Sequence, residues 1–540
     1  MALLFAVAVC LCATPMASSQ EFPFRNTSLP FDERVKDLVG RLTLEEMVAQ
    51  MSHGGANNNG PAPAIPELGI NPYQWGTECI SGDVDAGPAT SFPESIGLAA
   101  AFDYQLLYTF ARAVSNEVRA KNNNYTAHGD YSFHTGLSCW SPVINILRDP
   151  RWGRNQETYG EDPWLSGYLG RAYVTGLQGN NSRYVEANAG CKHFDVHGGP
   201  ENIPVSRFSF NANVTTRDWR MTFLPQFRAC IEAGAWSVMC SYNSINGVPA
   251  CANKELLTDI LRNEWGFKGY VVSDQGAIEN IMSAHHYTNS TVATAEVAVN
   301  AGTCLEDANE EDNVFASIGQ AVSEGLITDA TVIDAVSRLF LVRMRLGEFD
   351  PPEMNPYTKL KVEDYVQSEA HRQLSLEAAM ASAVLMKNDM TMGMTLPITT
   401  PVNSACVVGP FINDPSLYFG DYSPTLMPEY IVTVQDGLQD AMISKALSYA
   451  EGCTDGPKCN SYDSSVVKAC SDVELAIVTL GTGKVLESEG NDRADINLPG
   501  QQLKLLQDAA NSAKGPVVLV LYNAGPLDVS WAKSSDLSWL

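Results

Sequence analysis

The chain has 540 residues, 45% of them hydrophobic, and a formal net charge of −27 at pH 7. This length is enough for two or more domains, each with its own core. An acidic chain without clustered Lys and Arg does not offer a phosphate-binding surface, so we expect no nucleic-acid partner.

The first nineteen residues form an apolar run that ends in small residues, with Ala17 and Ser19 at a signal-peptidase site. The run is too short for a membrane-spanning helix. We therefore predict a signal peptide at 1–19 and a secreted protein that has no membrane segment after cleavage. Five Asn-x-Ser/Thr glycosylation triplets support export; they begin at Asn26, Asn124, Asn180, Asn213 and Asn289.

Thirteen cysteines are present, and two of them lie in the leader. The eleven that remain are an odd number, so at least one stays unpaired. Cys453 and Cys459, flanked by Gly, Pro and Asn, are predicted to form a local disulfide. The cysteines lack the Cys-x-x-Cys spacing of a zinc site, and we expect no metal.

From about residue 30 to 350, short apolar runs alternate with amphipathic helical stretches such as 218–232 and 254–264. This alternation predicts a (β/α)8 TIM-like barrel, which we assign to residues 20–350. The strand candidates are Val143–Leu147, Ala189–Phe194, Trp236–Cys240 and Gly269–Val272.

A Pro-rich segment at 350–357 interrupts the pattern, and we assign residues 351–380 to an interdomain linker, with a helix near 368–386. Residues 381–540 are predicted to form a layered α/β sandwich domain that is incomplete at Leu540. Its apolar runs read as buried parallel strands; they lie at 405–409, 475–480 and 517–521.

Asp274 follows an apolar, β-branched run directly and opens a Ser-Asp-Gln-Gly turn. Strands of an α/β barrel present catalytic groups at their C-terminal ends in this way, although Asp also caps helices. Other polar groups that could bind a neutral, polyhydroxylated ligand follow the remaining strand candidates. They are Arg154, Glu157, Glu161, Asp162, Lys192, His193 and Tyr242. Each has a structural alternative when taken singly, such as a surface ion pair between Arg154 and Glu157.

The order of five motifs resembles glycoside hydrolase family 3, most closely its β-xylosidase branch. The motifs are SPVINILRDPRWGRNQETYGED, CKHF, MCSYNSINGVPA, GYVVSDQGA and ESEGNDRADINLPG. The resemblance implies a retaining mechanism that uses two carboxyl groups. Asp274 matches the family's nucleophile. The acid/base of the family comes from a second-domain loop that matches Leu486–Arg493, where we choose Glu489 and keep Glu487 as the alternative.

The resemblance also implies a site for the first sugar, with Arg154, Lys192, His193 and Tyr242 as hydroxyl ligands and Met239 lining the wall. Glu78 stands where β-glucosidases of the family usually carry Asp. Its longer side chain would occupy the space that a glucose hydroxymethyl group needs, which favours xylose. The His expected three residues after Glu78 is Ser81 here, which bears on fine sugar specificity.

The expected activity is a β-xylosidase that acts on xylo-oligosaccharides without a metal or organic cofactor, because two carboxyl groups suffice. The alternatives are a β-glucosidase or α-L-arabinofuranosidase of the same family, or a non-catalytic carbohydrate-binding fragment. A more distant alternative is a β-N-acetylglucosaminidase, in which the Asp195-Val-His197 stretch would supply an Asp-His pair.

Overall fold

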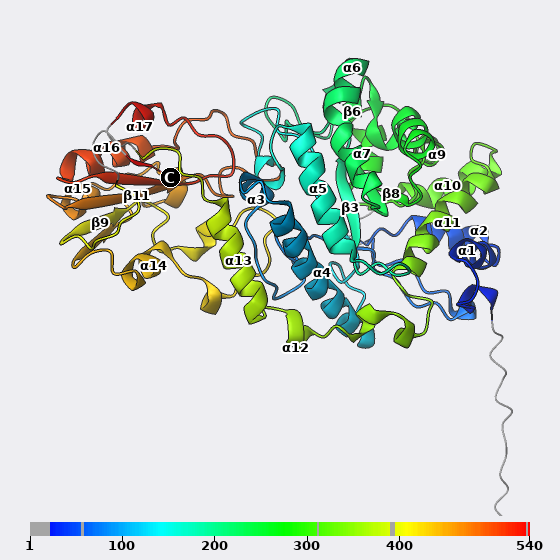
Figure 1. Cartoon of the computed structure of the whole chain (residues 1–540). Helices are drawn as coiled ribbons and strands as arrows, with labels where there is room; N and C mark the ends of the chain where they lie inside the picture. Colours follow the sequence, from blue (N-terminus) through cyan, green and yellow to red (C-terminus); the bar gives the residue numbers. More distant parts are fainter. Residues whose placement is uncertain (1–21, 56–58, 310–312, 389–394, 536–537, 540) are drawn as a thin grey trace, which may run out of the picture.

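The computed structural model describes residues 22–55, 59–309, 313–388, 395–535 and 538–539, so the predicted signal peptide lies outside the described residues. Figure 1 shows two bodies side by side, one coloured blue to green and the other yellow to red. Helix α13 (Glu369–Ser382) connects them and packs against α3 (Ser95–Ala100) and α4 (Tyr104–Ala127) of the first body. In the described part of the chain, no helix has both the length and the apolar character that crossing a membrane needs.

The first body is built on a five-stranded parallel sheet with the strand order β1-β2-β3-β5-β8. Every residue of these strands is buried, because the sheet lies inside a layer of helices. A bridge between Val272 and Leu305 continues the sheet beyond β8. The barrel-type α/β fold predicted from the alternating pattern is confirmed. The strands are β1 (Gly76–Thr77), β2 (Ser138–Cys139), β3 (Asn188–Phe194), β5 (Ser237–Cys240) and β8 (Tyr270–Ser273).

Helices lie around this sheet and alternate with its strands along the chain, as the sequence pattern predicts. Helix α5 begins where the side chain of Asp162 accepts hydrogen bonds from the backbone N–H groups of Trp164 and Leu165, with Pro163 at its first position. The helices of this body besides α3 and α4 are α1 (Phe31–Val39), α2 (Leu44–Met51), α5 (Pro163–Gln178), α6 (Thr216–Asp218), α7 (Pro225–Glu232), α8 (Ala277–Ser283), α9 (Thr291–Ala301), α10 (Ile318–Ser323) and α11 (Asp329–Arg345). Two π-helical segments are Trp219–Phe223 and Glu255–Glu264, and a small sheet joins β4 (Asn211–Ala212), β6 (Ser244–Ile245) and β7 (Val248–Pro249).

The predicted strand at Val143–Leu147 is wrong. Only Val143 forms a bridge, to Lys192 of β3. The next contact with β3 uses a side chain, because Asn145 donates to the carbonyl of His193 (2.8 Å) and accepts from its backbone N–H (2.6 Å). A side chain thus takes the place of the backbone ladder.

The second body is a five-stranded parallel sheet with the strand order β10-β9-β11-β12-β13. Side chains alternate along β9: Cys406 and Val408 join the core cluster that contains α15 and α16 residues, and Ala405 and Val407 join the cluster on the opposite face. The predicted layered α/β domain is confirmed. Its elements are β9 (Ala405–Val408), α14 (Val434–Asp440), β10 (Leu447–Ala450), α15 (Ser465–Ala469), β11 (Leu475–Gly481), α16 (Gln502–Ser512), β12 (Val517–Tyr522), α17 (Ser530–Ser534) and β13 (Ser538–Trp539).

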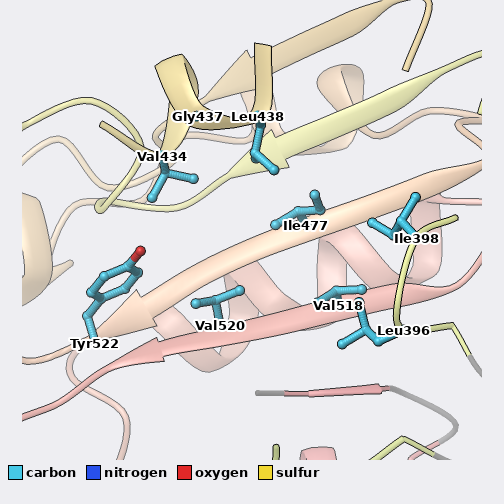
Figure 2. Close-up of a pocket in the computed structure, with 9 residues that line it drawn as sticks. All are labelled: Leu396, Ile398, Val434, Gly437, Leu438, Ile477, Val518, Val520 and Tyr522. Atoms are coloured by element: carbon cyan, nitrogen blue, oxygen red, sulfur yellow. The ribbon is translucent and has the colours of Figure 1, made fainter. Parts of the chain in front are cut away.

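The segment assigned as linker is largely helical. Two short 3-10 turns at Pro352–Met354 and Pro356–Lys359 precede α12 (Val362–Tyr365), and α13 follows. A cavity of about 350 Å³ lies under α14 on the second sheet (Figure 2). It contains no carboxylate, so it is not where the two candidate carboxyl groups meet. Its lining residues are Leu396, Ile398, Val434, Gly437, Leu438, Ile477, Val518, Val520 and Tyr522.

The described residues form five disulfides, including the predicted Cys453–Cys459 pair. Cys304 is free and buried, in agreement with the odd number of cysteines outside the leader. The other pairs are Cys79–Cys139, Cys191–Cys230, Cys240–Cys251 and Cys406–Cys470.

Candidate active site

The candidate residues of the first body lie at the carboxyl ends of its strands. Lys192 and His193 are near the end of β3, Tyr242 follows β5, and Asp274 follows β8. Because these strands are parallel, their carboxyl ends meet at one rim of the sheet. The sheet order thus brings together groups that are up to 82 residues apart in the sequence.

Asp274 does not cap the following helix. Gly276 has a left-handed φ of 78° and occupies the N-cap position of α8, with no side-chain cap. The Asp274 carboxylate instead accepts the backbone N–H of Gln275 at Oδ1 (2.9 Å) and faces His193 at Oδ2 (3.7 Å from Nε2). Burial raises the pKa of Asp274, and the nearby charge of Arg154 opposes the rise.

Glu78 and Lys192 form a buried ion pair across the rim. The Lys192 Nζ donates to both carboxylate oxygens of Glu78, at 2.7 and 2.9 Å. Glu78 lies just after β1, beside the Cys79–Cys139 disulfide that joins this loop to β2. Burial raises the pKa of Glu78, and the Lys192 ammonium opposes that rise.

Arg154 is fully buried, so its pair with Glu157 is not a surface ion pair. The guanidinium donates to both oxygens of Glu157, at 2.6 and 2.8 Å. This fork holds the side chain in place and leaves Nη1 to donate to Glu489 of the second body at 3.3 Å. Glu161 and Asp162, which the sequence placed beside this site, are exposed, and Asp162 caps α5.

Three further predicted residues, His193, Tyr242 and Met239, have different surroundings. Burial lowers the pKa of His193 well below its usual value, so this imidazole is neutral, and it is oriented by Asn145. The Tyr242 hydroxyl donates to the carbonyl of Gln275 (2.8 Å), which fixes the ring. Met239 is buried within β5, in register with Val272, and its contact with a ligand stays a prediction.

The two glutamates of the second-domain loop have different surroundings. Glu489 Oε1 accepts from Arg207 (2.6 Å) and Arg154, and its Oε2 accepts from the Tyr422 hydroxyl. Glu487 is completely buried and accepts from Thr482 and from the backbone N–H of Gly525. Glu489 therefore faces the barrel rim, and Glu487 faces the interior of its own domain.

The positively charged groups around Glu489 favour the ionised form of its carboxyl group. Burial alone would raise the pKa of this carboxyl, but Arg154, Arg207 and the Tyr422 hydroxyl outweigh burial and hold the pKa below its usual range. The Lys192 ammonium adds to the same effect and lies 4.9 Å from the centre of the Tyr422 ring.

Sequence reasoning missed Arg207, Tyr422 and Glu201. Arg207 bridges Glu489 and Glu201, and Tyr422 comes from the loop after β9. These residues lie on irregular loops, where no hydrophobic period marks them, and only tertiary packing brings them to the rim. Asp195 and His197 have separate partners: Asp195 accepts from Trp219 (2.7 Å), and His197 packs edge-on against Trp152. Among the described residues, no group of three or more His, Cys, Asp or Glu is arranged to hold a metal ion.

Two family models cover most of the chain. Residues 64–342 match the glycosyl hydrolase family 3 N-terminal domain, and residues 383–538 match the C-terminal domain of that family. Among curated relatives, "Probable beta-D-xylosidase 7" of Arabidopsis thaliana is 35% identical over 97% of this chain and 68% of its own length. "Beta-xylosidase/alpha-L-arabinofuranosidase 1" of Medicago sativa subsp. varia is 36% identical over 95% of this chain and 65% of its own length. The chain thus spans about two thirds of the length of these relatives.

Solved structures give the same relationship. A GH3 exo-beta-xylosidase in complex with a xylobiose aziridine activity-based probe superposes with a TM-score of 0.85 at 29% identity, covering 96% of this chain and 66% of that one. A beta-glucosidase from Listeria innocua in complex with glucose gives a TM-score of 0.79 at 26% identity, covering 94% and 72%. Both domain models, the curated relatives and the fold agree: the chain belongs to glycosyl hydrolase family 3.

Proposed function

We propose that this protein is a secreted, retaining exo-glycosidase that releases β-D-xylose from the non-reducing ends of xylo-oligosaccharides. The observation that carries the proposal is the meeting of two carboxyl groups at one rim. Asp274 comes from the barrel and Glu489 from the second domain, and Arg154 lies against Glu489 while its charge acts on Asp274.

In the proposed reaction, ionised Asp274 attacks the anomeric carbon and forms a covalent glycosyl ester. Glu489 gives its proton to the leaving oxygen, and then takes a proton from the water that hydrolyses the ester. Glu489 needs a proton for the first step, although Arg154 and Arg207 favour its ionised form. A sugar hydroxyl that accepts from Arg154 would weaken this hold as the substrate enters.

The remaining rim residues are proposed to bind the sugar. Arg154, Lys192, His193 and Tyr242 would bind hydroxyl groups, and Met239 would line the wall. Glu78, held by two hydrogen bonds from Lys192, would occupy the space of a hydroxymethyl group and so favour a pentose. No cofactor is needed, because the two carboxyl groups carry both displacements.

Two further observations support parts of this proposal. Five disulfides suit a secreted protein, because disulfides persist in oxidising compartments. The relative from Medicago sativa subsp. varia carries both activities in its name, so α-L-arabinofuranosidase activity is the second candidate.

The test compares the 4-nitrophenyl β-D-xyloside, α-L-arabinofuranoside and β-D-glucoside. We expect the highest kcat/KM on the xyloside, and a glucoside that reacts fastest would refute the role given to Glu78. Asp274→Asn is expected to lose turnover and keep xylose binding, measured by calorimetry. Equal, negligible turnover of both proteins, with xylose binding retained, would instead indicate a carbohydrate-binding protein.

A further inference from the structure

Glu201 lies in the loop after β3, is buried, and joins three separate segments of the chain. Its Oε1 accepts from the indole N–H of Trp152 (2.8 Å). Its Oε2 accepts from Arg207 Nη1 (2.7 Å) and from the backbone N–H of Gly490 (2.8 Å). Gly490 directly follows Glu489, so this barrel carboxylate fixes the second-domain backbone next to the proposed acid/base.

The contact between the two loops is reciprocal. Asp492, two residues after Gly490, turns its Oδ2 back toward the barrel and accepts three consecutive backbone N–H groups. The donors are those of Glu201 (2.7 Å), Asn202 (2.9 Å) and Ile203 (3.0 Å). Each loop therefore supplies a carboxylate to the backbone of the other, and charge-assisted bonds of this kind are the stronger class of hydrogen bond.

Arg207 connects Glu201 to the catalytic carboxyl itself. The same nitrogen, Nη1, donates to Glu201 Oε2 and to Glu489 Oε1, at 2.7 and 2.6 Å. The guanidinium also stacks over the Tyr242 ring, 4.7 Å from its centre, and this contact helps to hold it between the two carboxylates. Two carboxylates thus share one cationic nitrogen.

We propose that Glu201 is a positioning residue for the acid/base Glu489: it anchors the Glu489 loop on the barrel and shares Arg207 with Glu489, so that Glu489 can still take up a proton. This inference rests on the proposed function, which makes Glu489 the proton donor. The physical reason is competition, because a cation held by two anions stabilises each of them less than one held by a single anion.

Many charged and titratable groups face this network. They are the same in the wild type and in a Glu201 variant, so a difference between the two proteins reports Glu201. His197 lies 3.6 Å from Glu201 Oε1, and its pKa is lowered by burial to about 4, so it is neutral near neutral pH. The groups that face or act on Glu489 are Arg154, Glu157, Lys192, His197, Arg207, Tyr242 and Asp274 of the barrel, and Asp421 and Tyr422 of the second domain.

The test replaces the Glu201 charge while keeping its shape, with Glu201→Gln. We measure the pH dependence of kcat/KM on two substrates. The leaving group of a phenyl β-xyloside needs a proton to depart, and that of a 2,4-dinitrophenyl β-xyloside does not. We expect a loss of about 10-fold or more on the phenyl substrate, a much smaller loss on the dinitrophenyl substrate, and a shift to lower pH of the limb that reports Glu489 ionisation. Equal losses on both substrates with an unmoved limb would overturn the inference.

A second variant should shift the pH profile in the opposite direction. Arg207→Gln leaves the hydrogen bonds that Trp152 and Gly490 donate to Glu201 in place and removes the shared cation, so the limb that reports Glu489 ionisation is expected to move to higher pH. Glu232→Gln is the matched control, because Glu232 is an exposed glutamate paired with Arg171 on the barrel surface (3.1 Å). Its profile should equal that of the wild type.

Failure of the proposed function is recognised separately. If the wild-type protein cleaves no glycoside, the proposed activity is wrong, and hydrogen exchange of residues 486–493 then tests the anchoring alone. Faster exchange of this segment in Glu201→Ala than in the wild type supports the anchoring role, and unchanged exchange overturns it.

Discussion

Lys192 Nζ donates to both carboxylate oxygens of Glu78, at 2.7 and 2.9 Å, and so fixes the direction in which this carboxylate points. The pair joins the loop after β1 to the end of β3. Under the proposed function, a carboxylate held at both oxygens would discriminate between sugars by shape, because two hydrogen bonds oppose its rotation away from a larger substrate.

Shortening this side chain tests that discrimination. In Glu78→Asp, space opens where the carboxylate stood, so we expect the ratio of kcat/KM for the glucoside to that for the xyloside to rise roughly 10-fold or more, within the range of one methylene in a fitted pocket. The measurement is a paired assay on the two 4-nitrophenyl glycosides. A ratio that stays at the wild-type value would remove Glu78 from sugar selection.

The loop glutamates are separated by a matched pair of substitutions. Glu489→Gln removes the proposed proton donor and should lower kcat/KM on a phenyl β-xyloside by about 10²–10⁴-fold. Glu487→Gln keeps an oxygen for Thr482 and Gly525, so its activity should stay within a few-fold of wild type. The reverse order would make Glu487 the acid/base.

A pH profile for the proposed reaction follows from the two carboxyl groups assigned to it. Asp274 must be ionised, and burial raises its pKa; Glu489 must be protonated, and Arg154, Arg207 and Tyr422 hold its pKa below the usual range against burial. Glu489 therefore loses its proton at a lower pH than Asp274, so the form with ionised Asp274 and protonated Glu489 is most populated between the two apparent pKa values. We expect kcat/KM to peak on the acid side of neutrality, with apparent pKa values that belong to the coupled pair. A maximum above pH 8 would contradict this assignment.

Counting thiols tests the pairing of the cysteines. Cys304 is the one free cysteine in the described part of the chain, and it is buried. For the protein without residues 1–19, titration with a thiol reagent should find no reactive thiol in the folded state and one per chain in guanidinium chloride without reductant. Three or more thiols in the denatured protein would mean that one of the five disulfides is open.

A stability prediction concerns Asp350, the last residue of the range assigned to the barrel domain. Its carboxylate is buried and accepts from Arg34 (2.5 Å), Tyr184 (2.6 Å) and Arg183 (2.8 Å). Asp350→Ala leaves the buried Arg34 uncompensated and should lower the free energy of unfolding by about 3–5 kcal/mol, measured by urea denaturation. Asp334→Ala, which breaks the exposed pair with Arg338, should cost less than about 1 kcal/mol.

Much of the barrel rim was predictable from the sequence, because its groups directly follow apolar runs. Asp274 comes after Tyr270–Ser273, and Lys192 lies within Asn188–Phe194. The first two strands were not predictable, because Gly76–Thr77 and Ser138–Cys139 are two residues long and carry no period. Val143–Leu147 looked like a strand by composition, but the Asn145 side chain bonds to β3 in place of the backbone.

The residues that contact Glu489 could not be predicted from the sequence. Arg207 and Tyr422 come from loops of different domains and meet Glu489 only when the domains pack together. The different surroundings of Glu487 and Glu489 were not predictable for the same reason, because burial within the second domain distinguishes two glutamates that spacing alone does not.

The wide separation of Asp274 and Glu489 in the chain has a consequence during synthesis. Roughly two hundred residues lie between them, so a ribosome working at about 5–20 residues per second makes the second group on the order of 10–40 seconds after the first. The nascent barrel therefore carries the proposed sugar-binding rim before the proposed proton donor exists. Under the proposed mechanism, hydrolysis starts only when the second domain has emerged, folded and docked its Glu489 loop on the barrel.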